Sequence, residues 1–92
     1  MQSEAKDAER YFREQGFDHL RASHRGKVVT IESGPENDIV KHARFRKDTV
    51  HLWVLEIADH RGRFEPTGLR DTIDNLRVAL IENFPWVLEK IV

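Results

Sequence analysis

The chain has 92 residues, of which 39% are hydrophobic and 34% charged, with a formal net charge of -1 and no cysteine. This size and balance predict a single globular domain, residues 1–92, with a small core. Disulfides and cysteine-based zinc sites are excluded, and the near-zero net charge implies no general attraction to nucleic acid or membranes. The polar N-terminus and the absence of a long apolar run predict a cytoplasmic protein with no membrane contact.

A helix is predicted over residues 3–15, where Ser3 belongs to the residue types that cap helices. Three apolar side chains recur at the spacing of one helix face: Ala5, Ala8 and Phe12. Gly16 stands where a left-handed residue commonly ends a helix, and Phe17 follows it for a contact with Phe12. These signals predict that the first helix ends just before Gly16.

Strand-type segments come next, rich in β-branched or alternating apolar residues and separated by Gly, Pro, Asn and Asp. The predicted strands cover residues 17–23, 27–33, 39–46, 49–58 and 63–65. Every connection between them is short, which favours an antiparallel meander. Pro66 is expected to stop the last strand, because proline cannot donate to a strand ladder.

A second helix is predicted over residues 69–84 from one apolar stripe. The stripe consists of Leu69, Ile73, Leu76, Leu80 and Phe84. Thr67 and Asp71 are both candidates for its N-cap, and Pro85 is expected to end it. Residues 86–92 are expected to add a short helical turn, with three side chains available to close the core: Trp86, Val87 and Ile91.

The predicted order is therefore α-β-β-β-β-β-α. The fold class is α+β: a two-layer domain with an antiparallel β-meander of four to five strands and N-terminal and C-terminal helices packed on one face. Neither helix is long enough to be stable alone, so both must dock on the sheet.

The central hairpin decides which side chains face the helices. If Lys47-Asp48 is a two-residue turn, Phe45 lies opposite Val50, and side chains alternate between two faces from there. One face is then almost purely apolar: Ala43, Phe45, Val50, Leu52 and Val54. Glu56 shares this face by parity. A longer turn that kept Phe45 opposite Val50 would leave both faces unchanged.

The other face of the hairpin is mixed and is the candidate binding surface. It carries cations, an indole ring and aliphatic side chains: Arg21, His42, Arg44, His51, Trp53 and Leu55. Cations beside an aromatic ring on an open sheet suit single-stranded nucleic acid. The same residue types suit a protein interface. Alternatively, Trp53 could be covered by the last segment or by a second copy of the chain.

Signals for catalysis and cofactors are missing. The five histidines lack the spacings of metal ligands, although His42 and His51 would be diagonal neighbours in this register. No serine or threonine stands in a nucleophile elbow or triad context, and there is no Gly-rich phosphate loop. We therefore expect no enzyme activity, no cofactor and no metal.

A resemblance accompanies these patterns. The segments KHARFR, VHLWVLEI, DHRG and RFEP lie in one order with a helix at either end. This layout resembles small uncharacterised bacterial domains built as helix, antiparallel meander, helix. The resemblance implies the fold and no activity.

The sequence thus predicts a small non-catalytic binding domain that acts through the outer sheet face around Trp53. Its partner is expected to be an unidentified protein or a second copy in a homodimer. The alternative is a weak, sequence-tolerant binder of single-stranded nucleic acid.

Overall fold

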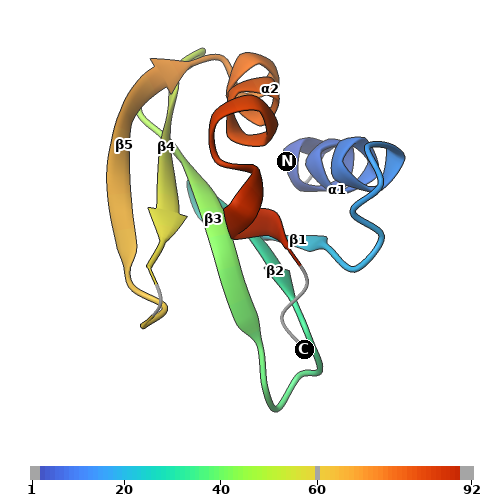
Figure 1. Cartoon of the computed structure of the whole chain (residues 1–92). Helices are drawn as coiled ribbons and strands as arrows, with labels where there is room; N and C mark the ends of the chain where they lie inside the picture. Colours follow the sequence, from blue (N-terminus) through green and yellow to red (C-terminus); the bar gives the residue numbers. More distant parts are fainter. Residues whose placement is uncertain (1–2, 60, 90–92) are drawn as a thin grey trace.

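A computed structural model describes residues 3–59 and 61–89. The elements in chain order are α1 (Ser3–Glu14), β1 (Arg21–Arg25), β2 (Val28–Ser33), β3 (Val40–Lys47), β4 (Trp53–Ala58), β5 (Phe64–Asp71), α2 (Ile73–Asn83) and the 3-10 helix η1 (Pro85–Leu88). The strands form one antiparallel five-stranded sheet in the order β1-β2-β3-β4-β5. Both helices and η1 lie on the same side of this sheet (Figure 1). The predicted two-layer α+β meander is confirmed.

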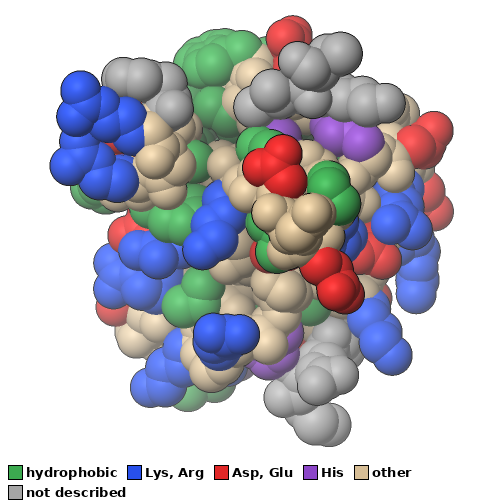
Figure 2. Space-filling view, turned by 90° about the horizontal axis from the view of Figure 1, so that it is seen from below, with side chains coloured by type: hydrophobic (Ala, Val, Ile, Leu, Met, Phe, Trp, Pro, Cys, Tyr) green, Lys and Arg blue, Asp and Glu red, His purple; other side chains and the backbone are tan. Residues whose placement is uncertain are grey.

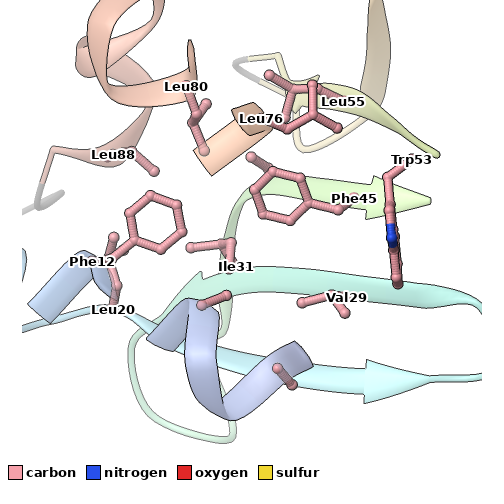
Figure 3. Packing of buried hydrophobic residues seen from close by; sticks show 13 residues of the cluster. Phe12, Leu20, Val29, Ile31, Phe45, Trp53, Leu55, Leu76, Leu80 and Leu88 are labelled. Carbon is pink, nitrogen blue, oxygen red and sulfur yellow. The ribbon is translucent and has the colours of Figure 1, made fainter. Parts of the chain in front are cut away.

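The core fills the space between the helices and the sheet. α1 contributes Phe12, whose ring stacks on that of Phe45 from β3 at a centroid distance of 6.5 Å. Leu76 and Leu80 of α2 and Leu88 of η1 close the same cluster (Figure 3). Because these side chains come from both ends of the chain, the core ties the two terminal segments together over the sheet.

The end of α1 matches its sequence signal. Gly16 has a φ of 99°, and the backbone N–H of Phe17 donates to the carbonyl of Phe12 at 3.0 Å. This bond satisfies a carbonyl that the helix leaves without an intrahelical partner. β1 begins at Arg21, later than predicted, since the chain first turns through Leu20, whose N–H donates to the carbonyl of Phe17 at 3.2 Å.

The second half of the chain corrects three predictions. β5 continues past Pro66 to Asp71, and α2 begins only at Ile73, so Leu69 lies in a strand. A proline is tolerated there because β5 is an edge strand. Thr72 caps α2, with its side chain accepting from the N–H of Asn75 at 3.3 Å, so neither predicted cap is correct.

The register of β3 and β4 is the most important correction. Phe45 pairs with Leu55 and Arg44 with Glu56, so the predicted pairing of Phe45 with Val50 is wrong. Asp48 and Thr49 donate their N–H groups to the carbonyl of Leu52, and this makes a longer loop than a two-residue turn. The partner of Phe45 moves from Val50 to Leu55, which is an odd number of residues along the chain. The β4 side chains predicted to face the helices therefore face the open side, and those predicted to face outward lie in the core.

The C-terminal segment forms the expected helical turn, but different side chains face the core. Leu88 is fully buried, whereas Trp86 is 61% exposed, so the prediction that Trp86 closes the core is wrong. Val87 is partly buried against the core, as predicted. Ile91 lies outside the described residues.

Candidate binding surface on the open sheet face

One face of the sheet is covered by the helices and η1, and the other is open (Figure 1). The strand registers place one set of side chains on this open face. They are Arg21, Ser23, Arg25, Val28, Thr30, Glu32, Lys41, Arg44, Arg46, Val54, Glu56, Ala58, Phe64, Pro66 and Arg70. Cations outnumber carboxylates in this set, so the open face is basic although the whole chain is not.

Glu56 is the centre of the open face. Its side chain is only 8% exposed, and Arg44 from the opposite position on β3 donates through Nε to Oε1. Arg46 donates to the other carboxylate oxygen at 3.2 Å. The Arg44 guanidinium also lies 4.4 Å from the centroid of the Phe64 ring. Hydrogen bonds to an ionised carboxylate in a low-dielectric site are stronger than neutral ones, so this cluster holds its side chains in place.

A row of arginines crosses the sheet beside Glu56. Arg25, Arg46 and Arg70 occupy one line of paired positions from β1 to β5, separated by Val28 and Val54. We call these five residues the arginine row. Neighbouring strands are about 4.8 Å apart, so successive arginines of the row are about 10 Å apart. Guanidinium groups at such spacing present several forked donors to carboxylates or phosphates.

Glu32 neutralises part of the charge near β1. Its carboxylate is 3.5 Å from the Arg21 guanidinium and accepts from the hydroxyl of Ser23 at 3.1 Å. Arg21 also donates to the carbonyl of Gly34 at 2.6 Å. Arg21 is therefore engaged with its own domain. Two arginines of the row are engaged as well, because Arg46 pairs with Glu56 and Arg70 with Asp48, whereas Arg25 forms no ion pair with another described residue. Figure 2, which views the molecule from below, shows blue Lys and Arg side chains on both its left and its right sides, with red Asp and Glu side chains among them.

The fold places the predicted site residues on different faces of the sheet. Arg21 and Arg44 lie on the open face as expected, and His51 is exposed in the loop between β3 and β4. Trp53 and Leu55 are 5% and 0% exposed on the helix-covered face, and His42 is 1% exposed. The expectation of an outer face around Trp53 is therefore wrong, because the register differs from the predicted one.

Part of the true surface could have been found by alternation alone. Arg46 is two residues after Arg44 on the same strand, and such residues share a face whatever the partner strand is. Arg25 shares a face with Arg21 on β1 in the same way, but it was missed because the predicted strand ended at residue 23. Arg70 was missed because it was expected in the helix over residues 69–84, whereas it lies in β5.

His42 has a structural role in place of the predicted exposed one. Its Nδ1 lies 2.6 Å from the carbonyl of Val87, which can only accept, so Nδ1 carries the proton. Nε2 of the neutral ring then accepts from the hydroxyl of Ser33 at 2.7 Å. Burial lowers the pKa of His42, the nearby His19 lowers it further, and the Val87 bond opposes the shift. His42 thus links β2, β3 and η1 as a neutral side chain.

His19 adds a second link to η1. Its Nε2 lies 2.7 Å from the carbonyl of Leu88, and its ring centroid is 6.0 Å from that of His42. Among residues 3–59 and 61–89, no three His, Asp or Glu side chains gather as a metal site would require. In the same ranges, no helix is long and apolar enough to cross a membrane.

Comparison with known proteins found no matching family model, no matching curated protein and no matching solved structure. The resemblance to small bacterial domains of the same layout stays a prediction.

Proposed function

We propose that this protein is a small non-catalytic binding domain that acts through its open sheet face, and that its partner is an acidic segment of another protein. The observation that carries the proposal is the arginine row together with the Arg44–Glu56–Arg46 cluster. The three arginines of the row are exposed, and its two valines are partly buried. Forked cations alternating with aliphatic side chains suit carboxylates carried on a polypeptide.

The alternative partner, single-stranded nucleic acid, has less support from this face. Binding of that kind combines phosphate contacts with bases stacked on aromatic rings. Trp53 is buried, and Phe64 is the aromatic side chain that the registers place on the open face. The Arg44 guanidinium already covers the Phe64 ring. Phosphate contacts remain available, but the stacking platform does not.

A homodimer that buries the open face against itself is also disfavoured by charge. A two-fold interface brings the same patch of both copies together, so the two arginine rows would face each other. Like charges at an interface are unfavourable. A cytoplasmic location is part of the proposal and is supported by the lack of cysteine in the chain.

The test is an amide NMR titration of the labelled chain with a Glu-rich peptide and, separately, with an oligothymidine of equal charge. The peptide is expected to shift amides of β1 to β5 next to the arginine row. Arg25→Glu should weaken this binding, because Arg25 is exposed and forms no ion pair with another described residue. Arg10→Glu is the matched control, since Arg10 is exposed on α1, in the other layer.

Three results would overturn the proposal. Tighter binding of the oligothymidine, with a steep loss on adding salt, would assign the face to nucleic acid. Equal weakening by Arg10→Glu and Arg25→Glu would show attraction to overall charge and no specific surface. A solution mass twice that of the 10.8 kDa chain, with shifts on the open face, would support the dimer.

A further inference from the structure

A pocket of about 530 Å³ lies at one end of the sheet, away from the open face cluster. The turn between β1 and β2, the loop between β3 and β4, and the first turn of α1 line it. Trp53 is part of its lining and stands at one end of the buried cluster, beyond Phe45 (Figure 3). A pocket of this size is within the range that holds small molecules in proteins.

Its apolar lining comes from Trp53 and Val50. Val50 is 75% exposed in the loop between β3 and β4, so a ligand in the pocket would remove an aliphatic side chain from water. A single exposed valine is ordinary on a protein surface. This valine differs in that it lines the same concave site as Trp53, which is 5% exposed.

Some of the charged side chains that line the pocket form ion pairs and others do not. Asp48 is already paired with Arg70 at 2.5 Å. Lys27 and Lys47 form no ion pair with any carboxylate that the structure describes. The Lys47 ammonium instead lies 5.7 Å from the centroid of the Trp53 ring. The N–H of Lys47 donates to the carbonyl of Lys27 at 2.8 Å, which brings these two residues together on the pocket wall.

We infer that this pocket binds a small anion that carries a flat apolar ring. The anionic group would pair with Lys47 and Lys27, and the ring would rest against Val50 and the small accessible part of Trp53, which is 5% exposed. Glu4 is the carboxylate in the lining without a described partner, and it opposes such a ligand. A nucleoside monophosphate and an aromatic carboxylate share the required chemistry. The inference does not rest on the proposed function of the open face, although Asp48 of the pocket lining pairs with Arg70 of the arginine row.

The experiment uses the full chain with the substitution Trp86→Phe. The chain has two tryptophans, so Trp53 is then the remaining one. Its indole N–H signal and the backbone amides are followed in NMR spectra during titration with AMP and with 4-hydroxybenzoate. Adenosine and phenol are the uncharged controls. We expect saturable shifts of the Trp53 indole and of residues 24–27 and 47–53, with at least one anion binding about tenfold more tightly than its control.

Charge variants test the assignment within the pocket. Lys47→Gln and Lys27→Gln are each expected to weaken binding about three- to tenfold, and Glu4→Gln to strengthen it about twofold. Lys41→Gln is the matched control: Lys41 is an exposed lysine on the same strand as Lys47, about 20 Å away by strand rise. It should leave binding unchanged.

Three outcomes would overturn the inference. One is the absence of a saturable Trp53 shift with either anion at about 10 mM. Another is an equal effect of Lys41→Gln and Lys47→Gln. The third is a set of shifts confined to Arg25, Arg46 and their neighbours, which would place the anion on the open sheet face. The two anions distinguish a phosphate ligand from a carboxylate ligand.

Discussion

Arg44 and Glu56 lie opposite each other on β3 and β4, and the Nε of Arg44 donates to the Glu56 carboxylate in the middle of an uncovered sheet face. Glu56 is only 6% exposed although no helix covers it. Its neighbours on the sheet exclude water from the carboxylate, and the two arginines replace that water. This pair holds the side chains of Arg44 and Glu56 in position at the centre of the open face.

Removing Arg44 should therefore cost more stability than removing Arg46. We expect Arg44→Met to lower the free energy of unfolding by about 1–3 kcal/mol, because a buried carboxylate loses its main donor. Arg46→Met should cost less than about 1 kcal/mol, since the Arg46 side chain is 53% exposed and its bond is 3.2 Å long. Urea unfolding of both variants measures the difference, and the reverse ranking would contradict this role of Arg44.

The two tryptophans should respond differently to truncation. Trp53→Ala is expected to lower the free energy of unfolding by about 3–5 kcal/mol, because Trp53 is 5% exposed and packs in the core. Trp86→Ala should change it by less than about 1 kcal/mol, because Trp86 is 61% exposed. Thermal or urea unfolding checks both. Equal small effects would mean that Trp53 is not in the core.

Stability should fall in mild acid because of His42. Burial, the main cause, lowers the pKa of His42 from its ordinary value of 6.5. The unfolded chain then binds the proton first, so the free energy of unfolding is constant above that pH and decreases as the pH drops below it. For a single proton this decrease is at most about 1.4 kcal/mol per pH unit, and it ends once His42 is protonated in the folded state.

Urea unfolding between pH 8 and pH 5 measures this slope. His42→Asn should flatten it relative to the parent chain, whatever its effect on stability at pH 8. His51→Asn, which changes an exposed loop histidine, is the control and should keep the parent slope. A slope unaffected by His42→Asn would rule out His42 as its source.

Two glycines with positive φ form a matched pair. A Cβ at Gly34 (φ 89°) would lie 2.7 Å from the backbone oxygen of Asp38, whereas a Cβ at Gly62 (φ 80°) meets nothing within 4 Å. Gly62→Ala should cost about 1–2 kcal/mol from backbone strain alone. Gly34→Ala should cost more, because a backbone atom must also move. Similar costs in unfolding experiments would show that the 34–39 loop adjusts freely.

The sequence alone determined the order of the elements and their division into two layers. These features depend on local patterns: the helical spacing of Ala5, Ala8 and Phe12, the glycine at position 16, and the short connections between strands. Such signals act over a few residues, so they can be interpreted without knowing what lies across the sheet.

Only the tertiary structure decided which side chains face outward. The faces of β4 depend on the loop from Asp48 to Leu52, whose bonds to the Leu52 carbonyl set Phe45 opposite Leu55. Because Phe45 pairs with Leu55 and not with Val50, the β4 register differs from the predicted one by an odd number of residues. Trp53 therefore lies in the core and not on the open face, and Glu56 faces outward toward the arginines. Because side chains alternate with a period of two, the binding surface depends on the register between strands, which no single strand encodes.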